Sequence, residues 1–140
     1  MNILNKTTSE ITALVLRISF GISLLAVGLS HYMTFAAFKP MVVSGLGPLE
    51  FLGVIWAFIL PALMILGGAT FVIGKFEEVA VLASGIALGS IPAGMLLKPV
   101  LTGVSLADMM PAAVNAFVWI IVFVLVVKMT NVSNKESSEN

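Results

Sequence analysis

The stretch Phe51–Ile73, FLGVIWAFILPALMILGGATFVI, runs for 23 residues without a charged side chain. At about 1.5 Å per residue, a helix of this length reaches roughly 35 Å, enough to cross the hydrocarbon core of a bilayer. Helices and closed barrels are the structures that satisfy their backbone hydrogen bonds in lipid, and a run this long and apolar is typical of a helix. The stretch therefore predicts a transmembrane helix, kinked at Pro61.

Three further apolar runs of spanning length lie on either side of it, at residues 11–30, 79–97 and 109–127. The first is too long for the core of a signal peptide and lacks a small-residue cleavage site after it, so we expect it to be retained. The run at residues 79–97 contains Pro92. The run at residues 109–127 begins beside Pro111, with Asp108 as its expected N-cap. The sequence thus predicts an all-α membrane protein, a four-transmembrane-helix bundle in up-down-up-down order.

The composition also indicates a membrane protein. Of 140 residues, 59% are hydrophobic and 10% are charged, whereas soluble domains average about 45–50% and 25%. The formal net charge is zero, which offers no electrostatic footprint for nucleic acid. With no cysteine and one histidine, the chain cannot build an iron–sulfur cluster or a Cys-type or His-rich metal site, so we expect no metal.

Lysine and arginine are divided unevenly between the two ends of the predicted bundle. With four spans, segment 1–10, loop 74–78 and tail 129–140 share one side. That side carries Lys6, Arg17, Lys75, Lys128 and Lys135. The other side has Lys39 and Lys98, so the positive-inside rule places both termini in the cytoplasm, with the chain in the cell membrane. The polar tail is expected to be disordered, which leaves residues 11–128 as one transmembrane domain.

Polar residues gather near the outer ends of the predicted helices, beside the two longer loops. Lys98 leaves the third helix, and Trp119 shares a face of the fourth with two of the candidates below. Histidine, tyrosine and carboxylates at a membrane boundary are suited to quinones, which need a donor for each carbonyl oxygen and a proton acceptor. The same residue types also form interfacial belts. The candidate ligand-binding residues are His31, Tyr32, Glu50, Asp108, Asn115 and, from the inner end, Arg17.

Three of these candidates carry more specific expectations. His31 would exchange a hydrogen bond with one ligand oxygen, with Glu50 or Asp108 as its charge partner. Arg17 either extends to the cytoplasmic headgroups or lies buried as a cation that holds an anionic ligand or a carboxylate. An unsatisfied Asn115 amide would cost about 1–3 kcal/mol in lipid. We therefore expect Asn115 to face the bundle and bond across helices, to a structural partner or to a ligand.

Glycines at helical spacing predict close helix contacts. Small residues let neighbouring backbones approach, which is the main device of helix packing in lipid. The spacing of the third run is also compatible with dimerisation, so a homo-oligomer remains open. The expected packing glycines are Gly21, Gly28, Gly67, Gly68, Gly85 and Gly89.

Residues 14–127 resemble the DoxX family of small four-helix membrane proteins. In the first run, the family's Leu-Arg and paired-glycine rhythm is matched by Leu16, Arg17, Gly21, Leu25 and Gly28. The family's second helix tends to end on an acid, two glycines, a leucine and a last glycine. That register reads Met64, Gly67, Gly68, Phe71 and Gly74 here. The glycines match, Met64 replaces the acid, and His31 replaces a lysine that often follows the first helix.

The resemblance implies a membrane subunit of a redox complex that contacts quinone or docks redox partner subunits, and no catalysis by the chain alone. Met64 in place of the acid weakens any proton-handling role at that position. The alternative is a non-catalytic scaffold that docks a protein through Phe35, Phe38, Lys39 and Pro40. A small-solute transporter would need broken helices around a midplane site, for which Pro61 and Pro92 are the kink candidates.

Overall fold

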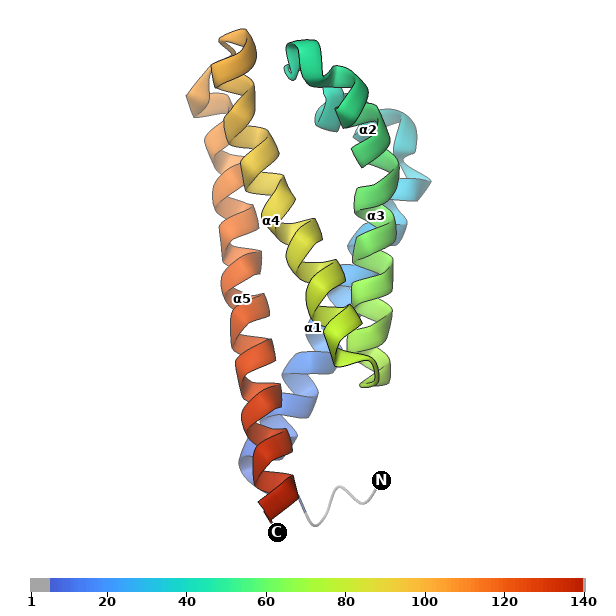
Figure 1. Ribbon diagram of the computed structural model, residues 1–140, viewed down its shortest axis with the longest axis vertical. Helices are drawn as coiled ribbons and strands as arrows, with labels where there is room; N and C mark the ends of the chain where they lie inside the picture. The colour runs from blue at the N-terminus through green and yellow to red at the C-terminus, as the bar shows by residue number, and fades with distance from the viewer. Residues whose placement is uncertain (1–5, 140) are drawn as a thin grey trace.

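The computed structural model describes residues 6–139 of the chain (Figure 1), and this part is all helical, with no strand. Residues 1–5 of the predicted N-terminal segment, and Asn140 of the predicted tail, lie outside the described residues. The elements are α1 Thr8–Met33, α2 Phe35–Val43, the short 3-10 helix η2 Gly47–Leu49, α3 Glu50–Ile73, α4 Glu77–Thr102 and α5 Leu106–Glu139.

Four segments are long and apolar enough to cross a membrane, namely α1, Gly47–Ile73, α4 and Leu106–Ser138. Most of their apolar side chains are exposed on the outside of the isolated chain, as at Ile55, Leu82 and Ile121. A helix that is apolar on its outer face is matched to lipid rather than to water. The prediction of an all-helical chain with four helices of spanning length is confirmed.

Contacts at the helix ends show how the elements lie relative to one another. Near the N-terminus, the hydroxyl of Ser9 in α1 donates to Glu136 Oε2 in α5 at 2.9 Å. Asn134 Nδ2 of α5 donates at 2.7 Å to Glu77 Oε1, in the first turn of α4. The start of α1, the start of α4 and the end of α5 therefore lie at one end of the bundle, and α2 lies at the other (Figure 1).

Glycines make the closest contacts between helices. A Cβ built on Gly28 of α1 would lie 2.9 Å from the Pro61 carbonyl oxygen of α3. One built on Gly67 of α3 would lie 2.2 Å from Ser84 Oγ of α4. Because no larger residue fits at these positions, α3 packs directly on α1 and on α4. Gly21 of α1 and Gly68 of α3 form a similar contact.

Gly85 and Gly89 of α4 differ from these four glycines. A Cβ on Gly85 would meet the Phe123 ring of α5 at an ordinary 3.5 Å, and one on Gly89 would meet nothing within 4 Å. The expectation of close packing at Gly89 is therefore wrong for the described chain. At Gly85 the neighbour across the interface is thus the Phe123 side chain of α5 and not a backbone.

The bundle interior is centred on aromatic and aliphatic side chains from all four long helices. The rings of Phe20 in α1 and Phe71 in α3 meet edge to face, with centroids 5.3 Å apart. Leu24, Leu88 and Val126 are fully buried around them. Edge-to-face pairs add about 0.5–1.5 kcal/mol to the gain from packing. The same buried cluster continues to Phe38 of α2.

Three boundary predictions require correction. The tail, residues 129–140, was expected to be disordered, yet α5 continues through Glu139, because no glycine or proline interrupts it after Pro111. Asp108 is not an N-cap, since α5 begins at Leu106 and places this carboxylate in the first turn. The segment 31–50 between the first two predicted spans is not a plain loop, because it contains α2 and η2.

Candidate functional site

A cavity of about 750 Å³ lies in the half of the bundle nearest α2. Its walls come from the end of α1, from α2, from the first half of α3, from the second half of α4 and from the first half of α5. In Figure 1 this is the end at which α4 stands away from α3. Pockets that hold small organic ligands measure about 300–1,000 Å³. The bundle therefore has space for one such molecule.

The wall of the cavity is mostly apolar. Leu60 and Met64 of α3 face it, together with Leu88 and Ile91 of α4. Both tryptophans of the protein line it as well, Trp56 from α3 and Trp119 from α5. A surface of this kind accommodates the hydrocarbon or ring system of a lipophilic molecule.

His31 brings a polar group to the cavity from the end of α1. Its ring stacks on Phe38 of α2, with centroids 4.1 Å apart and planes 18° from parallel. The stacking holds the imidazole by one face. The two ring nitrogens lie at the edge of the ring, and no residue among 6–139 makes a hydrogen bond with either of them. A neutral imidazole has one donor and one acceptor nitrogen. His31 is thus held by packing and can exchange a hydrogen bond with a ligand.

Trp56 and Ser90 form a polar tie across the same wall. The indole Nε1–H of Trp56 donates to Ser90 Oγ at 3.0 Å, and the Ser90 hydroxyl donates to the Ala87 carbonyl at 2.8 Å. The indole N–H and the serine O–H each donate their one proton within the protein, so neither is available as a donor to a ligand. This pair joins α3 to α4 beside the cavity and sets the spacing of its walls.

Lys98 is the cation of the cavity. Its side chain is 5% exposed, and its Nζ donates to the carbonyl of Met41 near the end of α2. One turn further along α4, Thr102 Oγ1 donates to the Gly45 carbonyl at 2.9 Å. The last carbonyls of a helix lack partners within it, so these two bonds fasten the end of α2 and the turn after it to α4.

The structure brings together two of the six predicted ligand-binding residues. His31 and Asn115 line the cavity. Tyr32 does not, because its side chain is exposed and its hydroxyl donates to the Phe58 carbonyl of α3 at 2.6 Å. Glu50 and Asp108 are exposed in the first turns of α3 and α5. An acid is stabilised there by the helix dipole. Neither carboxylate pairs with His31, so the expected charge partner is not found in the described chain.

Asn115 lies differently from the expectation. It was expected to bond across helices, but it is exposed in the isolated chain and no other residue between 6 and 139 accepts from or donates to its amide. At this end of the bundle, the cavity separates α4 and α5 from the other helices. Asn115 lies on the wall of this cavity, so no residue of another helix reaches its amide. Its amide is consequently available to a ligand.

Three polar residues of the wall were not among the sequence candidates. Lys98 stands before Pro99, a position typical of a helix end, but α4 continues to Thr102 and turns Lys98 inward. Trp56 and Ser90 lie inside apolar runs, where spacing alone does not distinguish a cavity from a core. The signal that could have identified Lys98 is its place on the face of α4 shared with Ile91 and Gly94.

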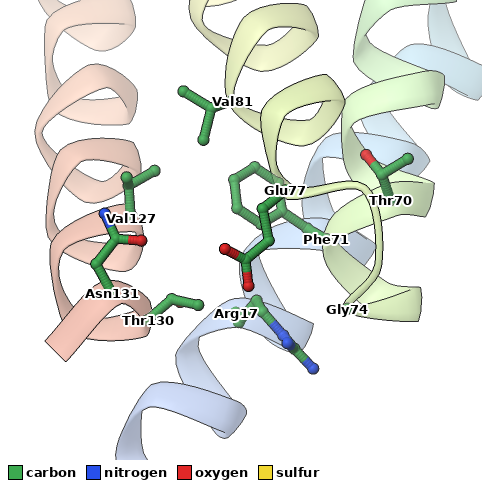
Figure 2. A pocket seen from close by; sticks show the side chains of 9 residues that line it. All are labelled: Arg17, Thr70, Phe71, Gly74, Glu77, Val81, Val127, Thr130 and Asn131. Atoms are coloured by element: carbon green, nitrogen blue, oxygen red, sulfur yellow. The ribbon is translucent and has the colours of Figure 1, made fainter. Parts of the chain in front are cut away.

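Arg17 of α1 does not line the cavity. It lies beside a second, small void together with Gly74, Glu77 and Thr130 (Figure 2). Its guanidinium covers Gly74, where an added Cβ would lie 2.5 Å from Nη1. Gly74 has φ 70°, a conformation that favours glycine. The Arg17 Nε is buried without a partner within residues 6–139, and a void of about 20 Å³ beside it is large enough for one water molecule.

Glu77 is the nearest acid to Arg17 in this void, but its carboxylate is engaged elsewhere. Asn134 donates to Glu77 Oε1, and Figure 2 shows the guanidinium turned away from that carboxylate. No ion pair joins Arg17 to an acid in the described range 6–139. Arg17 therefore belongs to the end of the bundle that holds the start of α4 and the end of α5, and not to the candidate site.

No family model, curated protein or solved structure matches this chain in the comparisons made with each. The class of protein follows from its own features. The chain is an all-helical bundle with four helices of membrane-spanning length, and it contains an apolar cavity with a few polar groups at one end.

Proposed function

We propose that this chain is a multi-pass protein of the cell membrane that binds a small amphiphile in the cavity beside α2. The amphiphile is of quinone type, and the chain presents it to a partner redox enzyme as a membrane subunit. The observation that carries the proposal is the joint presence of a ligand-sized apolar volume and two unpaired polar side chains, His31 and Asn115, on its wall.

The arrangement across the membrane is part of the proposal. The contacts between the start of α1, the start of α4 and the end of α5 support an up-down-up-down order. The excess of lysine and arginine at that end supports cytoplasmic termini. The cavity then opens in the outer half of the membrane, at the depth where the headgroup of an amphiphile lies.

The chemistry of the wall matches the two parts of such a ligand. His31 and Asn115 have N–H donors for the oxygens of a head ring, and Leu60, Met64 and Leu88 offer contacts to an apolar body. Quinones have this combination of two carbonyl acceptors and a hydrocarbon tail. In this proposal the electrons come from the partner redox enzyme, and the chain supplies the binding site.

The alternative of a docking scaffold has less support from the packing. Two of its four proposed contact residues face inward: Phe38 is buried against His31, and Phe35 packs on Phe58 with ring centroids 4.6 Å apart. Of the four, Pro40 is exposed. A partner that binds α2 would therefore contact little of the aromatic surface that the scaffold interpretation requires.

The intrinsic fluorescence of Trp56 and Trp119 gives a direct test, because both tryptophans of the protein lie in the cavity wall. Purified protein in neutral-lipid nanodiscs is titrated with decylubiquinone, which quenches nearby indoles. We expect saturable quenching. Gly94→Phe should weaken the quinone affinity at least tenfold, because Gly94 lines the cavity and a ring there takes up ligand space, while its Cβ meets no atom within 4 Å.

Gly89→Phe is the matched control. Gly89 lies on the same helix and also has open space around an added Cβ, but it does not line the cavity. It should bind quinone as the unmodified protein does. Quenching that never saturates, or that is equal in all three proteins, would overturn the proposal, since it would reflect quinone dissolved in the lipid.

A further inference from the structure

Lys98 is a buried cation with an incomplete set of partners. Its ammonium has three N–H donors, and one of them is used by the Met41 carbonyl. The side chain is 5% exposed and lines the cavity, and it makes no ion pair with any of residues 6–139. A buried charge is stable only when it is paired or fully hydrogen-bonded. The two remaining donors therefore need acceptors from outside the chain.

No acidic side chain of the cavity wall supplies the missing charge. The lining residues in the described part of the chain include neither aspartate nor glutamate. Glu50 and Asp108, the acids nearest to this end in the fold, are exposed and lie outside the wall. The Met41 carbonyl contributes the partial negative charge of a helix end, about half an elementary charge for the whole helix. Lys98 is thus only partly compensated.

We infer that the amphiphile bound in this cavity carries an oxyanion, and that Lys98 is its counter-ion. The inference rests on the proposed binding of an amphiphile and specifies the headgroup of that ligand. A charged oxygen would complete the donors of Lys98 in a surrounding of low polarity, where charge-assisted hydrogen bonds are strong. His31 and Asn115 line the same cavity and can share the anion.

Two kinds of amphiphile have this chemistry. An ionised hydroxyquinone carries an oxyanion on the ring itself, and it keeps the quinone type of the proposed function. A long-chain carboxylate carries the oxyanion at the end of a hydrocarbon, and its binding would keep the amphiphile site but replace the quinone. Both place one negative charge at one end of an apolar body. A neutral quinone offers acceptor oxygens only, so it would bind without neutralising Lys98.

A purely structural role for Lys98 predicts something different. If the ammonium serves only to hold the end of α2 through the Met41 carbonyl, the cavity has no reason to prefer an anion over a neutral molecule of the same shape. Thr102 already holds the adjacent Gly45 carbonyl, so α2 keeps one tie to α4 when Lys98 is replaced. The ligand preference therefore separates the two roles.

The test uses two matched pairs of probes in phosphatidylcholine nanodiscs at pH 8. One pair is 2-hydroxy-3-undecyl-1,4-naphthoquinone, which is ionised, and its neutral methyl ether, both measured by quenching of Trp56 and Trp119. The other is tetradecanoate and its methyl ester, measured by displacement of the bound ether. We expect the anionic member of at least one pair to bind tenfold or more tightly, and the pair that shows this identifies the source of the anion.

Variants then assign the preference to one side chain. Lys98→Gln should abolish the preference while the neutral ether still binds, and Lys98→Arg should keep it. Lys75→Gln, which removes an exposed lysine at the opposite end, should behave as the unmodified protein. If Lys98→Gln does not fold, the inference is still overturned by equal affinity for both members of each pair in the unmodified protein, or by loss of the preference in a folded Lys98→Arg.

Three failures are distinguishable. Equal affinity for both members of both pairs in the unmodified protein overturns the inference and leaves amphiphile binding in place, because the neutral probes bind. Absence of saturable binding for every probe overturns the proposed function as well. A preference for the anion that persists in Lys98→Gln removes Lys98 from the role of counter-ion.

Discussion

Gly21 of α1 and Gly68 of α3 face each other so closely that each occupies the space of the other's missing side chain. A Cβ built on Gly21 would lie 2.8 Å from the Gly68 carbonyl oxygen, and one built on Gly68 would lie 2.6 Å from the Gly21 carbonyl oxygen. The atoms in the way belong to backbone, which cannot turn aside as a flexible side chain can. The contact between α1 and α3 thus requires glycine on both sides.

Replacement of Gly68 by alanine should destabilise the bundle. The added methyl group forces α1 away from α3, which we expect to lower the free energy of unfolding by about 1–3 kcal/mol despite the better helix propensity of alanine. Unfolding by sodium dodecyl sulfate, followed by circular dichroism, measures this value. Gly89→Ala, in open space on α4, should leave stability unchanged or slightly raised. Equal stability of the two variants would show that the close contact does not hold the helices together.

Substitutions of His31 should separate its packing from its polarity. His31→Phe keeps an aromatic ring stacked on Phe38, so the free energy of unfolding should change by less than about 1 kcal/mol. His31→Ala loses the stacked ring and should cost about 0.5–1.5 kcal/mol more. Both variants lack the imidazole nitrogens, and both should weaken decylubiquinone binding in the fluorescence titration. Unchanged affinity in the two folded variants would remove His31 from the site.

The sequence predicts the helices well because a long apolar run has few alternatives in lipid. The runs at 51–73 and 79–97 lie within α3 and α4. The helix ends are predicted less well. Composition alone favours disorder in the polar tail, whereas its lack of glycine and proline, and its contacts with the start of α1, keep α5 helical to Glu139. Local composition carries no information about such contacts.

The site is predicted less completely than the fold for a related reason. His31 and Tyr32 are adjacent in sequence, but they point about 100° apart around α1, so only His31 reaches the cavity. Lys98 was expected at a helix end, and its burial depends on where α2 lies against α4. The cavity itself results from the way α4 and α5 diverge from α3, and a sequence pattern records helix faces but not the angle between helices.

The bond between Trp56 and Ser90 should act as a coupled pair. Trp56→Phe removes the donor, and Ser90→Ala leaves the indole N–H without an acceptor beside an apolar wall. We expect each change to lower the free energy of unfolding by about 1–2 kcal/mol. In the double variant the loss should be less than the sum, with a coupling of about 0.5–1.5 kcal/mol. Strict additivity would mean that the hydrogen bond between α3 and α4 contributes nothing to stability.

The end of α5 offers the clearest test of the difference between composition and structure. The Ser137 hydroxyl donates to Glu10 Oε1 at 2.7 Å and Asn134 donates to Glu77, so this polar segment contacts both α1 and α4. Amide protons of residues 133–138 should therefore exchange with deuterium more slowly than those of an unstructured peptide, by about tenfold or more. Ser133→Pro removes a helical hydrogen bond and clashes with the preceding turn, and it should abolish that protection while residues 109–127, the apolar part of α5, keep theirs. Mass spectrometry of peptides from this segment measures the exchange. Rates equal to those of a free peptide in the unmodified protein would show that the tail is disordered, as its composition alone predicts.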